Sequence, residues 1–581
     1  MIQRWWEKWP ERLEFELRCL VEAGIAFRFD EQARAAGIVK LLLHHRVNGE
    51  DLDLTAIFPD LYPYFRFEVQ APSLTLKRHQ HPAGGTLCLI GRATANWSSS
   101  NTLAGAITGQ LPSVLKAARA PQDSASATIE EHQGEPATDY FPYANDLAIL
   151  VDSDWSVRRD FSRGLLTLGI KADFRNRSAP RLQAIVKQVK DSADTTTLAQ
   201  ADSDLASCFE EEIQARWVRL GAPPPLLAPD DLVHLLSISD ANLLQPEWRA
   251  VGGGRIDVIG VVFPEEVGYQ TTADGWLFVL RLAKPGTNGK QGYSCYVRGL
   301  RGGRRDMSGR IPELAPLSKA TVVVAGLGAL GAPSAVDMAR AGVGELRLLD
   351  CDFVDPGTTA RYPLGLQAAG LQKTTALPEF LAANYPFTKV RMYPHRIGSV
   401  RDAADPVKPD PVLLEAILDG ANLVYDATAE IGIQHALSDL ARRKGIPYIC
   451  VSATEGAWGG LVARIRPGKT EGCWYCLMHH IDTRSIPPPP RNPTGTVQPI
   501  GCANPTFTGA GFDLAEIALA GTRLAVATLC ADHANAYSDC EWDIARISLR
   551  DETGRTIAPH YETFALKAHP KCESCRNASA A

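Results

Sequence analysis

The feature that most constrains this chain is a glycine-rich stretch at residues 321–352. A short β-branched run leads into Gly326, Gly328 and Gly331, and a helical run then leads to a second apolar run that ends in Asp350. This order predicts a strand, a helix and a second strand. The glycines let the backbone approach a phosphate at a helix N-terminus, and Asp350 is placed to hydrogen-bond a ribose. We therefore expect an adenosine nucleotide. The fingerprint alone also fits a nicotinamide-dependent oxidoreductase.

Charged residues beyond this stretch favour ATP. Arg361 and Lys373 follow within a short distance, and Asp426 ends another apolar run, at the edge where open α/β sheets bind ligands. Cations for phosphates and a carboxylate for a divalent metal suit triphosphate cleavage better than hydride transfer. Asp352 belongs to the same expected nucleotide site. A purely structural alternative pairs Arg361 with Asp352 or Asp355.

These residues resemble those of the ubiquitin-activating superfamily and its ThiF- and MoeB-type bacterial relatives. The resemblance implies a Rossmann-like adenylation fold that uses ATP and Mg²⁺. It assigns Asp350 to the ribose, Asp426 to the magnesium, and Arg361 and Lys373 to the triphosphate. The family usually has Asn three residues before the arginine, where this chain has Thr358.

Two Cys-x-x-Cys pairs predict a zinc site. They are Cys473-Trp-Tyr-Cys476 and Cys572-Glu-Ser-Cys575, among thirteen cysteines in the chain. Together they supply a closed tetrahedral set of thiolates, so we expect a structural Zn²⁺ that clamps the C-terminal tail. One pair alone could instead be redox-active.

Cys502 follows a proline-rich segment at 486–493 and precedes an apolar helix expected from Phe512 to Leu529. In the ubiquitin-activating relatives a loop crosses the active site here. The resemblance therefore implies that Cys502 is the thioester cysteine of the activating domain. The alternative is a packing thiol at the entrance of the helix.

The N-terminal segment predicts a helix over 11–23, from leucines at helical spacing, and strands over 38–46, 52–58 and 65–69. A His-Pro motif, Cys88 and a tryptophan follow.

This arrangement resembles the catalytic core of ubiquitin-conjugating enzymes over roughly residues 10–120. It implies that Cys88 carries a thioester. The family usually has Asn after His-Pro, whereas this chain has Ala83. The alternative for Cys88 is a buried core thiol.

We expect a multidomain α/β protein. Residues 1–120 form the α+β conjugating-like domain, and 121–146 have the small, polar composition of a flexible linker. Residues 147–310 predict a mixed, β-rich middle domain with a helical portion over 204–220, serving as an adaptor or a spacer. Residues 311–581 form the adenylation domain with its zinc site.

Composition narrows the possible partners. A net charge of −6 gives no reason to expect nucleic-acid binding. No run of about 18 apolar residues occurs, so we expect no membrane span and a cytoplasmic protein. Five arginines ahead of the nucleotide fold form either a solvated face or a contact to ATP phosphates, as happens from a partner subunit in carboxylate-adenylating enzymes. They are Arg298, Arg301, Arg304, Arg305 and Arg310.

An activating and a conjugating fold on one chain imply a relay from Cys502 to Cys88 and then to a target amine. This domain order resembles the fused enzymes of bacterial antiphage cyclic-oligonucleotide (CBASS) operons. That family activates the C-terminal tail of a cGAS-like nucleotidyltransferase and forms homodimers. One alternative is a fused enzyme for a bacterial ubiquitin-like protein. Another is a sulfur-carrier adenylyltransferase with an appended non-catalytic module.

Overall fold

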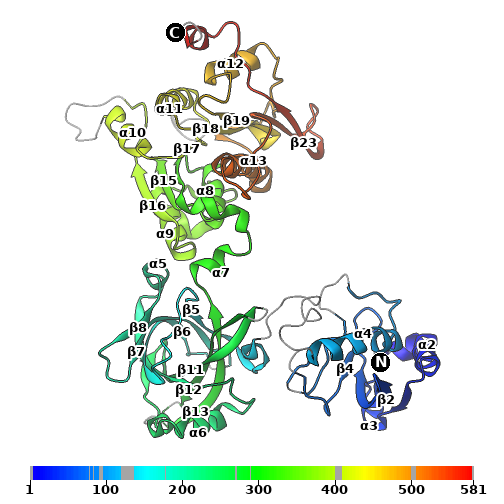
Figure 1. Cartoon of the computed structure of the whole chain (residues 1–581). Coiled ribbons are helices and arrows are strands. Elements are labelled where there is room, and N and C mark those ends of the chain that lie inside the picture. Colours follow the sequence, from blue (N-terminus) through cyan, green and yellow to red (C-terminus); the bar gives the residue numbers. More distant parts are fainter. Residues whose placement is uncertain are drawn as a thin grey trace. The chain divides into compact units, whose positions relative to one another are not determined.

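The computed structural model describes residues 4–76, 79–82, 84–90, 96–119, 136–176, 178–268, 271–284, 286–287, 290–399, 409–498 and 506–578 (Figure 1). By its internal contacts the chain divides into two compact units. One comprises residues 1–201 and 209–301, and the other comprises residues 202–208 and 302–581. Among the described residues, no helix is both long and apolar enough to cross a membrane.

The N-terminal part of the first unit is a four-stranded antiparallel sheet in the order β1-β2-β3-β4. Helix α4 places Leu103, Ile107 and Leu111 at a four-residue spacing, so they lie on one face and pack into the same core as Leu20 of α2. The elements are α1 (Trp5–Lys8), α2 (Pro10–Glu22), β1 (Ala26–Phe29), α3 (Glu31–Ala35), β2 (Lys40–Val47), β3 (Glu50–Ile57), β4 (Glu68–Gln70) and α4 (Leu103–Arg119).

The helix expected over 11–23 is confirmed as α2, and the expected strands correspond to β2, β3 and β4. The sequence did not reveal β1, whose four residues Ala-Phe-Arg-Phe are half-buried or exposed. Such a short strand carries too little alternation to be recognised by pattern.

The middle of the chain forms a closed barrel. Its strands run in the order β11-β12-β13-β5-β7-β6-β9, and β9 pairs in parallel with β11 to close the ring. Alternate residues of the strands fill a core that includes Leu166, Trp217 and Phe278. The elements are η2 (Ala137–Tyr140), β5 (Tyr143–Val151), β6 (Arg163–Asp173), β7 (Arg181–Asp191), β8 (Thr197–Gln200), α5 (Ser203–Ala206), β9 (Glu211–Arg219), α6 (Pro229–Ser237), η3 (Ala241–Leu244), β10 (Arg249–Val251), β11 (Gly254–Gly268), β12 (Thr271–Ala283) and β13 (Gln291–Arg301).

The helical portion expected over 204–220 is wrong. The structure has a single helical turn, α5, followed by the strand β9. Ile213, Ala215 and Trp217 are buried at a period of two, so one face of a strand packs into the barrel. In addition, β5 begins at Tyr143, inside the range expected to be linker.

The second unit is built on an eight-stranded sheet in the order β16-β15-β14-β17-β18-β19-β22-β23. The first five strands are parallel, and the last three run antiparallel to their neighbours. The chain passes from β14 to β15 on one side and later returns to β17 on the other. The carboxyl end of β14 is therefore the position where such sheets bind nucleotides.

Helices cover both faces of this sheet (Figure 1). Helices α8, α9 and α13 share one core with the first face, and α10, α11 and α12 share another with the second. The strands are β14 (Thr321–Ala325), β15 (Glu345–Asp350), β16 (Lys389–Pro394), β17 (Leu423–Asp426), β18 (Tyr448–Ala453), β19 (Gly459–Ile465), β20 (Thr496–Val497), β21 (Thr506–Phe507), β22 (Ile544–Arg550) and β23 (Thr556–Phe564). The helices are α7 (Arg304–Ser308), η4 (Pro312–Lys319), α8 (Gly331–Arg340), η5 (Pro356–Thr358), η6 (Gly365–Ala368), α9 (Lys373–Asn384), α10 (Asp410–Leu418), α11 (Ile431–Lys444), η7 (Glu455–Ala457), α12 (Trp474–Asp482), α13 (Gly511–Cys530) and α14 (Glu573–Ala578).

Candidate functional site

The glycine loop connects β14 to α8 and requires glycine for steric reasons. Gly326 has a φ of +81°, and a Cβ there would lie 2.7 Å from the backbone nitrogen of Thr428. A Cβ on Gly331 would overlap the carbonyl oxygen of Gly326. At Gly328 a Cβ would meet nothing within 4 Å, so the loop is open at that point. The loop therefore fits a phosphate beside the N-terminus of α8.

Asp350 ends β15 and is tied to this loop. Its Oδ2 accepts a hydrogen bond from the backbone N–H of Leu327 at 2.6 Å, and its Oδ1 accepts one from the N–H of Asp352 at 2.7 Å. The carboxylate therefore lies beside the glycine loop at the carboxyl edge of the sheet, as the sequence predicted. This is where an open α/β sheet holds the ribose of a nucleotide.

Lys373 completes the group next to the glycine loop. It is the first residue of α9, and its Nζ lies 3.1 Å from Oδ2 of Asp352 and 3.5 Å from Oδ2 of Asp350. An isolated antiparallel β-bridge between Phe353 and Gln372 joins the two ends of the intervening loop. The structure thus brings together the glycines, both aspartates and one of the two predicted cations.

Arg361 has different partners. Its Nη1 donates to the carbonyl oxygen of Phe507 at 2.5 Å, and its Nη2 donates to Oγ1 of Thr506 at 2.7 Å. Partial burial lowers the pKa of its guanidinium from the usual value. Among the described residues it forms no ion pair, so the alternative pairing with Asp352 or Asp355 does not occur there.

Asp426 lies at the end of β17, paired with Ala325 at the start of the glycine loop. Its side chain is fully buried. Its Oδ1 accepts from the backbone N–H and hydroxyl of Thr428 at 3.0 and 2.7 Å, and its Oδ2 accepts from the Tyr448 hydroxyl at 3.0 Å. Burial raises the pKa of Asp426 to about 6.

Sequence reasoning did not identify three further residues of this site. Tyr448 and Thr428 hold the Asp426 carboxylate. Thr428 could have been found, because an aspartate often hydrogen-bonds the backbone two residues on. The third is Tyr362, whose buried hydroxyl has no hydrogen-bond partner within the part of the chain that the structure describes. Burial, and to a smaller extent the charge of Asp350, raise the pKa of this hydroxyl. A buried hydroxyl without a partner is a candidate to hydrogen-bond a polar ligand.

Cys88 is exposed, which rules out the alternative of a buried core thiol. It lies at the end of a tight hairpin whose other arm starts at His79, and the Cys88 N–H donates to the His79 carbonyl oxygen at 2.9 Å. Gly84 and Gly85 turn the chain with φ values of +80° and +70°. Ala83 and Cys502 lie outside the described residues.

The four predicted zinc ligands form one cluster, with all four sulfur atoms within 4.8 Å of one another. Neighbouring sulfurs are 3.5, 3.6 and 3.9 Å apart. A tetrahedral zinc with metal–sulfur bonds of about 2.3 Å places its sulfurs about 3.8 Å apart, so the cluster fits that ion. His480 is not part of it, because its ring nitrogens contact Ser485 and the carbonyl oxygen of Lys567.

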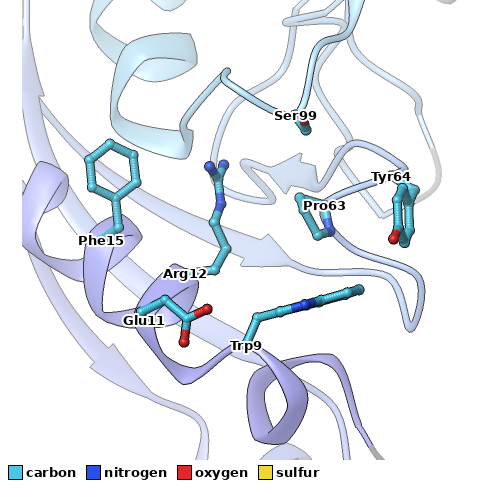
Figure 2. Close-up of a pocket in the computed structure, with 7 residues that line it drawn as sticks. All are labelled: Trp9, Glu11, Arg12, Phe15, Pro63, Tyr64 and Ser99. Carbon is cyan, nitrogen blue, oxygen red and sulfur yellow. The ribbon is translucent and has the colours of Figure 1, made fainter.

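A cleft of about 490 Å³ lies in the N-terminal part of the chain (Figure 2). Arg12 reaches into it from α2, and its Nη2 is held by Glu16, the Tyr62 hydroxyl and the Asn101 carbonyl oxygen. None of its lining residues is among the predicted site residues. They are Trp9, Glu11, Arg12, Phe15, Pro63, Tyr64 and Ser99.

Two of the five arginines ahead of the nucleotide fold have aromatic or acidic partners of their own. Arg304 lies 3.2 Å from a carboxylate oxygen of Asp202 and stacks over the Phe387 ring at 4.1 Å. Arg298 stacks over the Tyr143 ring at 4.5 Å. Neither contact places an arginine at the glycine loop.

Comparison with known proteins assigns the family. The ThiF family pattern matches residues 308–553. The protein y4oA of Sinorhizobium fredii (strain NBRC 101917 / NGR234), itself uncharacterized, is 32% identical over 98% of this chain and 97% of its own. The sulfur carrier protein ThiS adenylyltransferase of Bacillus subtilis (strain 168) is 29% identical over 28% of this chain and 45% of its own.

Among solved structures, E. coli MccB with ATP is 18% identical, over 45% of this chain and 68% of that one. Its TM-score of 0.33 is too low to bear on the function of this chain. The glycine loop, Asp350 and Lys373 all lie inside the region that the ThiF pattern matches. The chain therefore belongs to the family of y4oA and carries a ThiF family domain over residues 308–553.

Proposed function

We propose that the ThiF domain uses ATP to adenylate the C-terminal carboxylate of a protein. The observation that carries this proposal is the convergence of the open glycine loop, Asp350 and Lys373 at the carboxyl end of β14. The sulfur carrier adenylyltransferase that resembles part of the domain supports the reaction class. A nicotinamide oxidoreductase has no comparable support.

In this proposal each residue has one task. Backbone N–H groups of the glycine loop hold phosphate, Asp350 holds the ribose, and Lys373 and Arg361 bind the triphosphate. Magnesium would be held by Asp426, and Asp352, which is exposed beside Lys373, belongs to the same proposed nucleotide site. When bound, the ion neutralises phosphate charge. Oδ2 of Asp426 accepts a single hydrogen bond, from the Tyr448 hydroxyl, so it retains a lone pair that could bind the ion.

The proposed reaction has four steps: adenylation, thioester formation, thioester exchange and transfer to an amine. A carboxylate oxygen attacks the α-phosphorus of ATP, the bond to the β-phosphate breaks, and pyrophosphate leaves. A cysteine thiolate then attacks the carbonyl carbon of the acyl adenylate, and AMP leaves. We assign this cysteine as Cys502. A second exchange passes the acyl group to Cys88, and an amine of the target finally displaces the Cys88 thiolate.

The exposed position of Cys88 supports its place in this relay. The hairpin from His79 to Cys88 presents the thiol at a fixed backbone position. A linker ahead of η2, within the range expected from the sequence, would raise the effective concentration of Cys88 near Cys502. The relay also needs reduced thiols, which agrees with a cytoplasmic location.

For the biological setting we propose antiphage signalling of the CBASS type, in which the activated partner is the C-terminal tail of a cGAS-like nucleotidyltransferase and the enzyme is a homodimer. A bacterial ubiquitin-like protein is the alternative partner. A sulfur-carrier adenylyltransferase is the second candidate function, favoured by the sulfur carrier relative.

We propose that the four-cysteine cluster holds a structural zinc. All four sulfurs would be ligands, which leaves no position for water and therefore no catalytic role. Three of the cysteines are buried, as expected of a site that holds segments together.

The test incubates the full chain with Mg–ATP and a candidate partner and analyses adducts on a non-reducing gel. The relay predicts an adduct that a thiol reagent removes, that is absent in Cys502→Ala and that accumulates on Cys502 in Cys88→Ala. The Cys208→Ser variant is the matched control and should behave as the wild type. An ATP-dependent adduct that persists in Cys502→Ala would overturn the relay, and pyrophosphate release with no adduct would favour the sulfur-carrier function.

A further inference from the structure

Arg361 is held along one edge of its guanidinium by the strand β21. Both contacts use the outer nitrogens: Nη1 donates to Phe507 and Nη2 to Thr506. The guanidinium also lies over an aromatic ring, with its central carbon 5.2 Å from the centroid of Phe507. Three constraints on a long side chain define its position closely.

This edge contact leaves donors available. A guanidinium carries five N–H groups in a rigid, planar fork, and it recognises phosphate best through two of them side by side. Within the described part of the chain, Arg361 donates only to Thr506 and Phe507. Its Nε–H and remaining Nη–H groups are therefore free for another acceptor, and Arg361 is not fully buried.

The strand that holds Arg361 is itself anchored. β21 pairs with β20, and the N–H of Thr508 donates to the carbonyl oxygen of Gly495 at 2.7 Å. Gly511, the first residue of α13, packs so closely that a Cβ there would lie 2.9 Å from the carbonyl oxygen of Ala360. The residue before Arg361 and the start of α13, which follows β21, are therefore in close contact beside these hydrogen bonds.

We propose that Thr506 and Phe507 are positioning residues for ATP: they hold one edge of the Arg361 guanidinium so that its other edge binds the triphosphate. Arg361 then bridges the nucleotide and the β20–β21 ribbon. The inference rests on the proposed use of ATP by this domain. Thr506 and Phe507 would not touch the nucleotide themselves and would act on it only through Arg361.

Thermodynamic linkage gives this arrangement two consequences. If the ribbon positions Arg361 for the triphosphate, weakening the ribbon contact weakens ATP binding, and ATP in turn stabilises the ribbon. If the ribbon instead competed with phosphate for the same donors, weakening the contact would strengthen ATP binding. The sign of the effect therefore separates the two arrangements.

The first test measures binding of a non-hydrolysable ATP analogue and of AMP to the full chain by calorimetry. Thr506→Val removes the acceptor with little change in volume, and we expect affinity for the analogue to fall about fivefold, as for loss of one typical hydrogen bond, because Thr506 acts only through Arg361. Thr506→Ser keeps the hydroxyl acceptor and should bind the analogue as the wild type does. Affinity for AMP should not change, because AMP lacks the β- and γ-phosphates.

Thr494→Val is the matched control, because among the described residues the Thr494 hydroxyl donates to Asn492 and makes no contact with Arg361. Unchanged or tighter binding of the analogue by Thr506→Val would overturn the inference, and so would an equal loss for AMP. If the wild type binds neither nucleotide, the proposed function fails, and this inference fails with it.

The second test measures hydrogen exchange of the backbone over residues 506–514. The ATP analogue should slow exchange there in the wild type, and AMP should not. In Arg361→Lys the difference between the two nucleotides should disappear, because lysine has no planar fork to bridge both partners. Equal protection by AMP and the ATP analogue in the wild type would contradict the bridge.

Discussion

Asp350 shows how a single carboxylate can organise the proposed nucleotide site. It accepts hydrogen bonds from the N–H groups of Leu327 and Asp352, and Lys373 lies nearby. The bond from Leu327 fixes the glycine loop, and Lys373 places a positive charge beside the carboxylate. Asp350 therefore links the glycine loop, the segment after β15 and the start of α9.

Asp350→Asn tests this role. The change removes the charge and exchanges one acceptor for a donor that faces a backbone N–H or Lys373. We expect ATP affinity to fall about 10- to 100-fold, the range for losing hydrogen bonds to a charged group. Calorimetric titration with ATP measures it. Asp337→Asn, in an ion pair with Arg340 on α8, is the control and should bind as the wild type does.

Asp426 predicts a pH dependence of stability. Burial raises its pKa to about 6 in the folded protein, above the value of about 4 expected in the unfolded chain. The folded state therefore binds the proton more tightly, and the stability that this proton contributes is lost as the pH rises from about 4 to 6. By linkage the ionised form costs about 3 kcal/mol at neutral pH.

The measurement compares thermal unfolding of the wild type and Asp426→Asn between pH 4.5 and 7, without Mg²⁺ or nucleotide. The asparagine does not titrate, so the stability of the wild type relative to the variant should decrease as the pH rises. A stability difference that stays constant across this range would show that Asp426 does not titrate in it.

At the residue scale, the sequence predicted what depends on local order. The glycines and Asp350 follow one strand–helix–strand unit, and Lys373 begins the next helix, so their convergence could be inferred. The partners of Arg361 could not, because Thr506 and Phe507 lie about 145 positions away in the sequence. Tyr448 was missed for a similar reason: it reaches Asp426 through pairing of β17 with β18.

At the scale of elements, the cysteine cluster joins two segments that no sheet connects. Cys473 and Cys476 lie at the start of α12, and Cys572 and Cys575 lie 99 residues further on, in or beside α14. Here the spacing within each pair was enough to predict the cluster, because each pair already places two thiolates side by side.

Removal of the metal should loosen both segments. We expect one zinc per chain, and we expect a strong chelator to increase hydrogen exchange over α12 and residues 566–578, because binding free energy of a structural zinc is also folding free energy. Cys572→Ser should not retain zinc, whereas Cys208→Ser, outside the cluster, should. Full zinc content in Cys572→Ser would contradict the four-cysteine assignment.

Elements of the barrel illustrate where pattern fails. β9 was expected to be helical, yet Ile213, Ala215 and Trp217 alternate into the barrel core. The parallel pairing of β9 with β11, which closes the ring, joins strands separated by α6, η3 and β10. Composition could indicate a β-rich domain, but closure depends on contacts between distant segments.

At the scale of the whole molecule, the ThiF domain occupies residues 308–553, and two other folded parts precede it. The N-terminal sheet presents Cys88, and the barrel lies between it and the ThiF domain in the sequence. The proposed thioester relay and the proposed positioning of Arg361 both depend first on adenylation itself.

The most direct measurement of that claim is exchange of labelled pyrophosphate into ATP by the full chain, with a cGAS-like nucleotidyltransferase as the candidate partner. Exchange reports reversible formation of an acyl adenylate, before any cysteine takes part. We predict exchange that requires Mg²⁺ and the free C-terminal carboxylate of the partner, that is abolished by amidation of that carboxylate, and that needs a higher ATP concentration in Asp350→Asn. Exchange that continues with the amidated partner would contradict the account. So would a chain that binds ATP but catalyses no exchange with either proposed partner, the nucleotidyltransferase or a ubiquitin-like protein.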